Sequence, residues 1–152
     1  MYERKIVELY QKLGSSFVGS LATIDANSNP AVRTVSMLLI DGCIYFQTDS
    51  MMDKAREIQA NNNVAVCIDG VQIKGYCKEC GKVSEESVFE DRYKEIFPSA
   101  YEKYSHLENE RVYKISPVWI KCWSYLDNQA CYEIYDLTEK KYIVEYYQKG
   151  EK

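Results

Sequence analysis

Apolar residues recur at helical spacing at the start of the chain. Ile6, Leu9 and Leu13 share one face of a predicted helix over residues 2–13, and Gly14 follows as a stop signal. This pattern predicts an amphipathic helix that lays one face on the rest of the protein. Similar spacing predicts a helix that ends at residues 61–63 and another over residues 85–96, with a break or a further short helix after residue 97.

Shorter apolar or alternating segments, bounded by turn residues, predict strands. They cover residues 17–24, 31–40, 43–48, 64–68, 72–83 and 112–125. The pair Asp41-Gly42 is typical of a two-residue hairpin turn, which requires positive φ. Gly75 inside a strand indicates a bend or a close backbone approach, and Pro117 indicates an edge strand or a bulge.

The order of these elements favours one fold class. About six strands follow one another in antiparallel runs, and helices interrupt the runs rather than alternating with the strands. This is the α+β, mainly β pattern of a small or half-open antiparallel barrel with flanking helices. A length of 152 residues predicts a single domain, residues 1–152. Residues 131–147 fit a strand, a helix or both.

Charge and hydropathy argue against two classes of partner. The chain carries a formal net charge of −4, whereas a nucleic-acid-binding domain usually presents a basic face. No apolar run reaches the roughly 18 to 20 residues that a spanning helix needs. Residues 1–14 alternate charged and apolar side chains and so lack the apolar core of a signal peptide. We therefore expect a cytoplasmic protein that binds neither nucleic acid nor membrane.

The six cysteines include one Cys-x-x-Cys pair, Cys77 and Cys80. Zinc and a dithiol redox motif are both alternatives for this spacing. A structural zinc site usually needs four ligands, and His106 is the one histidine of the chain. The redox motif normally lies between a strand and a helix. The pattern favours reduced cysteines that act as small apolar residues, with no metal.

Two cations, a hydroxyl group and a helix start lie within one short stretch. Arg33 offers a forked, bidentate partner from a predicted strand, and Lys54 offers a point charge one turn into a predicted helix. The Thr48 hydroxyl precedes that helix, for which Ser50 and Asp53 form a predicted capping box. Helix N-termini attract anions, so the combination predicts a phosphate site. Taken singly, either cation is more often a solvated charge.

The run GSLATID…NPAVRTVSM…DGCIYFQTDSMMDKAREIQANNNVAVCI resembles the pyridoxamine-phosphate-oxidase-like FMN-binding split barrels. The resemblance covers residues 19–68 directly and follows the order of elements more loosely to residue 125. The small nitroimidazole-reductase-like and general-stress-type members are nearest in size. The resemblance implies a six-stranded antiparallel split β-barrel that binds FMN.

Carried over to this chain, the resemblance implies seven cofactor-binding residues and leaves the catalytic residues unknown. One cation pair would grip the phosphate, the first strand stretch would lie along the isoalloxazine edge, and a glutamine and a threonine would contact ribityl or phosphate. The phosphate pair is Arg33 and Lys54. The strand stretch along the isoalloxazine edge is Arg33, Thr34, Val35 and Ser36, and the glutamine and threonine are Gln47 and Thr48.

The resemblance also implies a homodimer with FMN at the subunit interface. Trp119, Trp123 or the tyrosine-rich tail over residues 132–147 would then cover the partner's flavin, although barrel core is the commoner place for such tryptophans. Two departures argue against pyridoxamine-phosphate oxidase activity itself. Asp53 and Leu38 stand where those oxidases often carry basic residues, and the C-terminal Arg-x-His substrate motif is missing.

We therefore expect an oxidoreductase that passes electrons from a reduced donor, NAD(P)H, through FMN to a small electron-poor substrate. One alternative is a flavin-binding or redox-sensing protein without turnover. Another is a barrel that binds haem or a deazaflavin, because the fold does not select the ligand.

Overall fold

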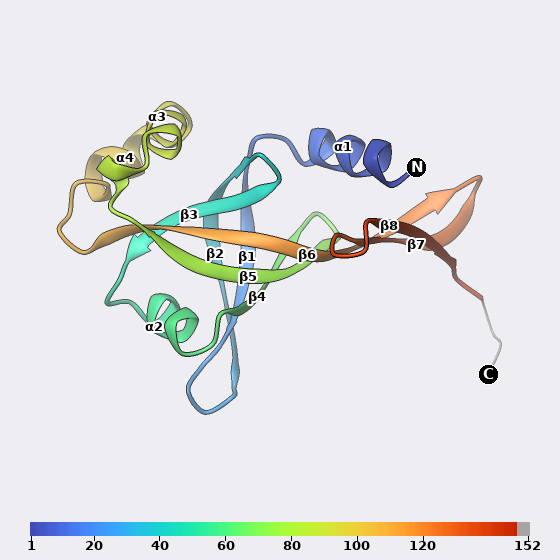
Figure 1. Cartoon of the computed structure of the whole chain (residues 1–152), viewed down its shortest axis with the longest axis horizontal. Coiled ribbons are helices and arrows are strands. Elements are labelled where there is room, and N and C mark those ends of the chain that lie inside the picture. Colours follow the sequence, from blue (N-terminus) through green and yellow to red (C-terminus); the bar gives the residue numbers. More distant parts are fainter. Residues whose placement is uncertain (149–152) are drawn as a thin grey trace.

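The computed structural model describes residues 1–148, in which eight strands form one antiparallel sheet with helices around it (Figure 1). The strands are β1 (Ser16–Ile24), β2 (Pro30–Ile40), β3 (Cys43–Asp49), β4 (Asn63–Ile68), β5 (Val71–Gly81), β6 (Glu110–Leu126), β7 (Gln129–Asp136) and β8 (Lys141–Tyr146). The helices are α1 (Tyr2–Leu13), α2 (Asp53–Ala60), the short 3-10 turn η1 (Val83–Glu85), α3 (Ser87–Ile96) and α4 (Pro98–Tyr104).

Six of the strands close into a barrel. The order along the sheet is β3-β2-β1-β4-β5-β6, and β3 also pairs with β6. The first and last of these six strands are therefore hydrogen-bonded to each other and the sheet closes, which confirms the expected six-stranded α+β barrel. The C-terminal half of β6 continues past the barrel and pairs with β7, which pairs with β8. Residues 131–147, left open by the sequence, thus lie mainly in strands.

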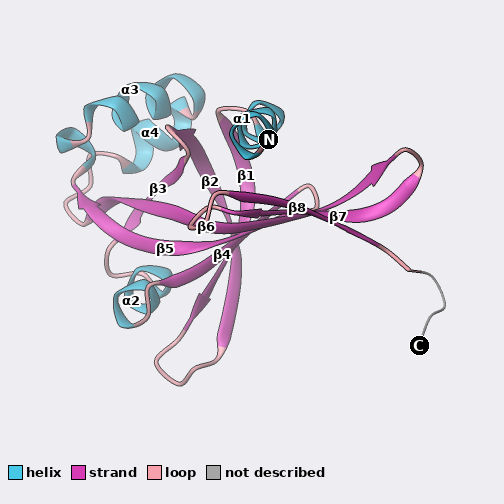
Figure 2. Cartoon of the chain, turned by 45° about the vertical axis from the view of Figure 1, so that its right-hand side comes forward, coloured by secondary structure: helices cyan, strands magenta, loops and turns pink. Residues whose placement is uncertain are grey.

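The strands direct alternate side chains into the barrel. Its interior holds large aliphatic and aromatic side chains that are fully buried, among them Leu21, Met37, Ile44, Phe46, Ile73 and Ile115. A second, smaller cluster forms where α3 packs on the outer side of β2, around Leu38, Phe89 and Tyr93. Figures 1 and 2 show α3 and α4 together on one flank of the barrel and α2 on another.

The turn and glycine predictions are confirmed. Asp41 and Gly42 have φ values of 50° and 77°, as a primed hairpin turn requires. A Cβ atom on Gly75 would lie 2.4 Å from the carbonyl oxygen of Ser116, so β5 and β6 approach there too closely for any side chain. The register shifts at Lys74/Gly75, opposite Pro117, which places the expected bulge.

The predicted capping box at the start of α2 is wrong. The helix begins at Asp53 after Met52, and no side chain caps it. Asp49 accounts for the difference, because its carboxylate accepts a hydrogen bond from the Met51 N–H at 2.8 Å and its carbonyl accepts from the Met52 N–H at 3.1 Å. This local turn delays the helix and leaves Ser50 outside it.

All six cysteines are free thiols. Cys77 is buried in the barrel, and burial raises the pKa of its thiol to about 12. Cys80 is half-buried at the second cluster. Cys77 and Cys80 lie three residues apart in β5, so their side chains point to opposite faces of the strand. In residues 1–148, no three potential metal ligands lie together, and no helix is long and apolar enough to cross a membrane.

Candidate functional site

A cavity of about 360 Å³ lies between the outer side of β2, the end of β3, the start of α2 and the α3–α4 pair, and we call it the β2–β3 cavity. Six of the seven expected cofactor-binding residues line it: Thr34, Val35, Ser36, Gln47, Thr48 and Lys54. Residues that the sequence did not single out complete the wall, namely Asp49, Met52, Tyr93, Ala100, Tyr104, Leu107 and Glu110. The structure therefore gathers residues that lie far apart in the chain around one hollow.

The backbone of β2 is open toward this cavity. Residues 30–38 pair with β1 on one side, but pairing with β3 covers only residues 38–40. Residues 34–37 therefore have a strand partner on one side alone. Their free edge offers backbone donors and acceptors to whatever occupies the cavity.

The start of α2 presents further donors. The first helical hydrogen bond joins the Arg56 N–H to the Met52 carbonyl at 3.1 Å, so the N–H groups of the first turn have no partner within the helix. The Thr48 hydroxyl and the Lys54 ammonium each contact the Met52 sulfur at 3.6 Å. A thioether is a weak acceptor, which leaves both donors able to take a stronger one.

Lys54 lies in an unfavourable electrostatic position. Burial lowers the pKa of its ammonium group, and the nearby Arg33 lowers it further, whereas Glu110, Asp49 and Asp53 act in the opposite direction. Within residues 1–148, Lys54 forms no ion pair. An anion at the start of α2 would offset the cost of desolvation and screen the repulsion from Arg33.

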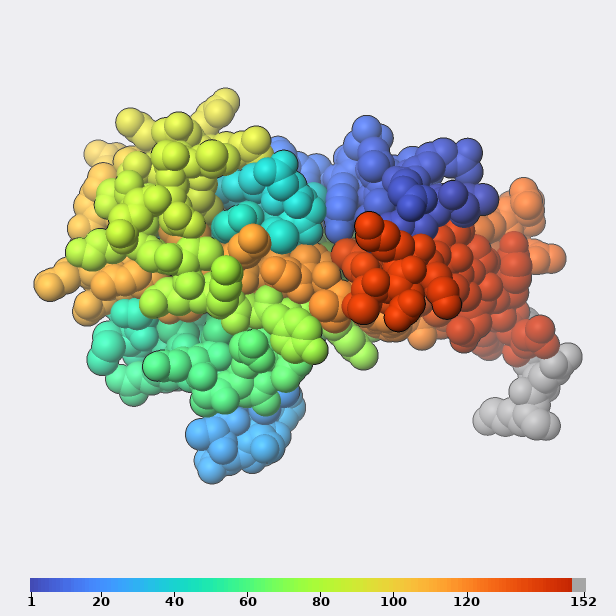
Figure 3. Space-filling view, in the orientation of Figure 1, coloured from blue at the N-terminus to red at the C-terminus, as the bar shows by residue number. Residues whose placement is uncertain are grey.

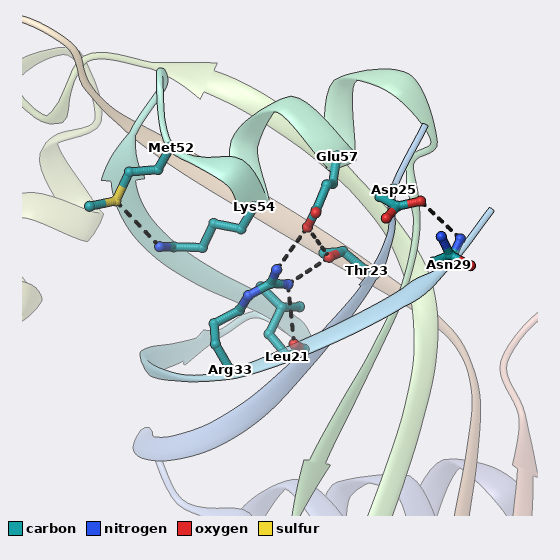
Figure 4. A network of polar contacts seen from close by, with 8 residues as sticks. All are labelled: Leu21, Thr23, Asp25, Asn29, Arg33, Met52, Lys54 and Glu57. Carbon is teal, nitrogen blue, oxygen red and sulfur yellow. Dashed lines mark hydrogen bonds and ion pairs between the residues drawn. The ribbon is translucent and has the colours of Figure 1, made fainter. Parts of the chain in front are cut away.

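Arg33 is directed elsewhere. Its side chain lies on the barrel side of β2, and its Nη2 donates to Glu57 Oε1 at 2.7 Å (Figure 4). Its Nη1 donates to Thr23 Oγ1 at 2.6 Å, and that hydroxyl donates in turn to Glu57 Oε1 at 2.7 Å. Arg33 therefore borders the β2–β3 cavity without lining it. The hydrogen bond from Thr23 and the contact with Arg33 hold the pKa of Glu57 below its usual range.

A buried polar chain forms the wall opposite Lys54. The Gln47 side chain donates to Glu110 Oε2 at 2.8 Å and accepts from the Ser105 hydroxyl at 2.8 Å. Glu110 is only 6% exposed, and this burial raises the pKa of its carboxyl group. Sequence reasoning missed Glu110 because it lies in a polar stretch of the sequence, and only its pairing at the start of β6 with Asp49 at the end of β3 brings it to the cavity.

The remaining candidates lie apart from the cavity. His106 is exposed and packs edge-on against Tyr101, with ring centroids 5.1 Å apart. Trp119 carries Lys74 over its ring at 4.6 Å, and Trp123 stacks among exposed tyrosines of the β6–β8 hairpins. Neither tryptophan can cover this chain's own cavity, and their role toward a partner's cavity stays a prediction.

A protein-family comparison matches residues 3–124 to the model of pyridoxamine 5′-phosphate oxidase, most of the chain. The chain belongs to the pyridoxamine 5′-phosphate oxidase family. A search among curated proteins found no match. The family assignment agrees with the resemblance seen in the sequence and with the barrel.

Solved structures show the same fold. A pyridoxamine 5′-phosphate oxidase-related, FMN binding protein from Nostoc punctiforme is 15% identical, with a TM-score of 0.65 over 96% of this chain and 94% of that one. General Stress Protein 26 from Bacillus anthracis is 20% identical, with a TM-score of 0.61 over 79% and 92%. The haem storage protein HutZ from Vibrio cholerae is 17% identical, with a TM-score of 0.60 over 76% and 89%. At these identities the likeness concerns the fold, and the names of these proteins refer to two different ligands, FMN and haem.

The Arg33–Glu57 pair predicts an acid-dependent stability. Because the folded-state pKa of Glu57 is lowered, its contribution is present above its unfolded pKa of about 4.3 and is lost as pH falls through the folded value. Replacing Glu57→Gln should lower the free energy of unfolding by about 1 kcal/mol at neutral pH. It should also flatten the acid limb of the stability curve.

Urea unfolding from neutral to acid pH measures both effects. Glu102→Gln, at an exposed position on α4, is the matched control and should change stability by less than about 0.5 kcal/mol. An acid limb as steep in Glu57→Gln as in the wild type would contradict this role for the pair.

Proposed function

We propose that this protein binds FMN in the β2–β3 cavity and acts as an oxidoreductase. The observation that carries the proposal is the uncapped start of α2 beside the Thr48 hydroxyl and the half-buried Lys54, which forms no ion pair within the described chain. A helix start with free N–H groups and a nearby cation suits a phosphate monoester. FMN, when bound, supplies reversible one- and two-electron transfer.

The open edge of β2 supports the orientation of the ring. In the proposal, the isoalloxazine lies along Thr34, Val35 and Ser36, where backbone groups have a strand partner on one side only. A flat polar ring system needs such directed donors and acceptors along its edge. Tyr93 and Tyr104 wall the same cavity and would keep water from part of the ring.

Arg33 joins the phosphate site in this proposal through its charge. It lies near enough to Lys54 to lower the pKa of that ammonium group, although its guanidinium is hydrogen-bonded to Glu57. An anion between the two cations would be attracted by both. Gln47 would act at the ribityl chain, since it lines the cavity while both ends of its amide are held in place.

The reaction class follows from the cofactor and the family. A reduced nicotinamide would deliver electrons to the flavin, and a small electron-poor acceptor would remove them. Pyridoxamine-phosphate oxidation is not part of the proposal, because Asp53 stands beside Lys54 and Leu38 is buried under α3. The negative charge of Asp53 would repel the phosphate group of a second, phosphate-bearing substrate.

We also propose that two copies associate around their cofactor sites. Large apolar side chains are exposed on β1, β2 and β5, among them Val18, Val32 and Tyr76, and a largely apolar hollow of about 330 Å³ lies between β1, β4 and β5. Exposed apolar surface of this kind is typical of a protein interface. A second copy related by a two-fold axis would cover it on both chains at once.

The visible spectrum tests the cofactor. Protein purified or reconstituted with FMN should show flavin bands near about 375 and 450 nm, and the released ligand should be FMN. A Soret band would indicate haem, and a single band between the flavin maxima would indicate a deazaflavin. If no flavin spectrum forms even with added FMN, the central proposal fails. Anaerobic bleaching by NADH or NADPH, followed by reoxidation with a nitroaromatic compound, distinguishes an enzyme from a sensor.

Replacing the two cations that would hold the phosphate should weaken the binding of FMN. Lys54→Ala and Arg33→Ala should each reduce FMN affinity by about 1.5 to 3 kcal/mol, roughly 10- to 150-fold, because the first removes a charge-assisted contact to the phosphate and the second removes a nearby positive charge. The affinity for riboflavin, which lacks the phosphate, should fall much less in both variants. Quenching of flavin fluorescence measures both ligands. Lys12→Ala on α1 is the control, and unchanged FMN affinity in both cavity variants would refute the site.

The association predicts a mass of about twice 17.7 kDa in light scattering of FMN-loaded protein. Val32→Glu, at a residue 69% exposed in the single chain, should shift the mass toward the monomer because it adds a charge to the apolar face. A monomer mass for the loaded wild-type protein would contradict the proposed dimer.

A further inference from the structure

Glu110 is an unexpected neighbour for a phosphate site. Its carboxyl group lines the β2–β3 cavity together with Lys54, and it is almost fully buried. Gln47 donates one hydrogen bond to its Oε2 at 2.8 Å, and no ion pair reaches it within residues 1–148.

Charged and titratable groups face Glu110 from each of the elements packed around it. Asp49 on β3 repels it and Lys54 on α2 attracts it, while Tyr93 on α3 faces it with a phenol whose pKa is raised to about 12 by burial and by Glu110 itself. Its neighbour Arg111 does not neutralise it, because that guanidinium donates to the backbone carbonyls of Glu108 and Glu110 at 2.7 and 2.9 Å. Lys54 is therefore the main compensating charge for both Glu110 and any bound anion.

We propose that Glu110 couples the binding of a phosphate-bearing ligand in the β2–β3 cavity to the uptake of one proton by its carboxyl group. The inference rests on the proposed phosphate site at the start of α2. An anion that enters the cavity competes with the Glu110 carboxylate for Lys54 and repels it in a poorly hydrated space. A proton from solvent removes that repulsion and leaves the ligand unchanged.

The hydrogen-bond chain can accept this proton without rearrangement. A neutral carboxylic acid keeps one oxygen that accepts from Gln47 and gains one O–H donor for the ligand. Ser105 continues to hold the other end of the Gln47 amide. The chain from Ser105 to Glu110 thus fixes the carboxyl group in both of its protonation states.

The direction of the pH effect follows from linkage. Burial already raises the pKa of free Glu110, and the bound anion raises it further. Between the free and the bound value, the complex holds more protons than the free protein, so affinity falls as pH rises, by up to about tenfold per pH unit. The second ionisation of the phosphate, near pH 6, acts in the opposite direction. A variant without the carboxyl group separates the two effects.

The experiment compares FMN with riboflavin on three proteins over about pH 5 to 9. Wild type, Glu110→Gln and Glu108→Gln are titrated by flavin fluorescence, and calorimetry in buffers of different ionisation enthalpy counts the protons taken up. Glu108 is the matched control, since it has the same charge, is exposed and lies two residues away, in the turn before β6. Riboflavin removes the phosphate while keeping the ring.

For FMN, the wild type and Glu108→Gln should take up protons and lose affinity with rising pH. Glu110→Gln should take up fewer and bind FMN about tenfold tighter at the alkaline end, where the wild type carries an uncompensated carboxylate. Riboflavin should bind all three proteins with little proton uptake. Equal proton uptake in the wild type and Glu110→Gln would overturn the inference while leaving the FMN site intact.

Two further outcomes keep the test decisive. If the wild type binds no FMN, the proposed function fails and the inference fails with it. If Glu110→Gln does not fold, carbon-13 NMR of the wild-type glutamate carboxyl groups replaces it. The Glu110 resonance should titrate at a higher pH with FMN than without, and an unchanged midpoint would overturn the inference.

Discussion

Six residue pairs between β3 and β6, from Ile44 and Ile115 to Asp49 and Glu110, close the barrel. This pairing joins segments more than sixty residues apart, so its entropic cost is met only once the interior packs. It also determines the site, because the same register brings Glu110 beside Gln47 and carries the α3–α4 pair to the flank of β2 (Figure 2). The cavity is therefore a product of barrel closure rather than of any local motif.

The charges of the site are arranged in two groups. Arg33 is satisfied by Glu57 and Thr23 on the barrel side of β2, whereas Lys54 shares the outer cavity with Asp49 and Glu110. A single lysine facing two carboxyl groups has little excess positive potential of its own. The N–H groups at the start of α2 then supply positive potential that does not depend on titration.

The sequence predicted what local chemistry determines. The Asp41-Gly42 turn and the end of α1 at Gly14 each depend on a few neighbouring residues, and the structure confirms them. The structure also confirms the close approach that Gly75 indicated, although its partner, Ser116, lies far along the chain. The resemblance to split barrels supplied the fold and a set of residues of which six line one cavity. The Ser50 capping box failed because a competing turn from Asp49 uses the nearby N–H groups.

The sequence could not predict partners that only tertiary pairing creates. Nothing near Arg33 in the chain indicates Glu57, and nothing near Gln47 indicates Glu110 or Ser105. The β7–β8 hairpin was equally hidden, because its irregularly spaced tyrosines suit either a helix or a strand. Figure 3 shows how far this hairpin and the tip of the β1–β2 hairpin project from the body of the molecule.

The one-sided pairing of β2 has a consequence for solubility. A strand edge with free backbone groups is a template on which another chain can form a sheet, and proteins usually shield such edges. Here the α3–α4 pair packs alongside the outer side of β2, and polar Thr34 and Ser36 occupy the open stretch. Any occupant of the cavity that bonds to these groups would also protect the chain from intermolecular β-association.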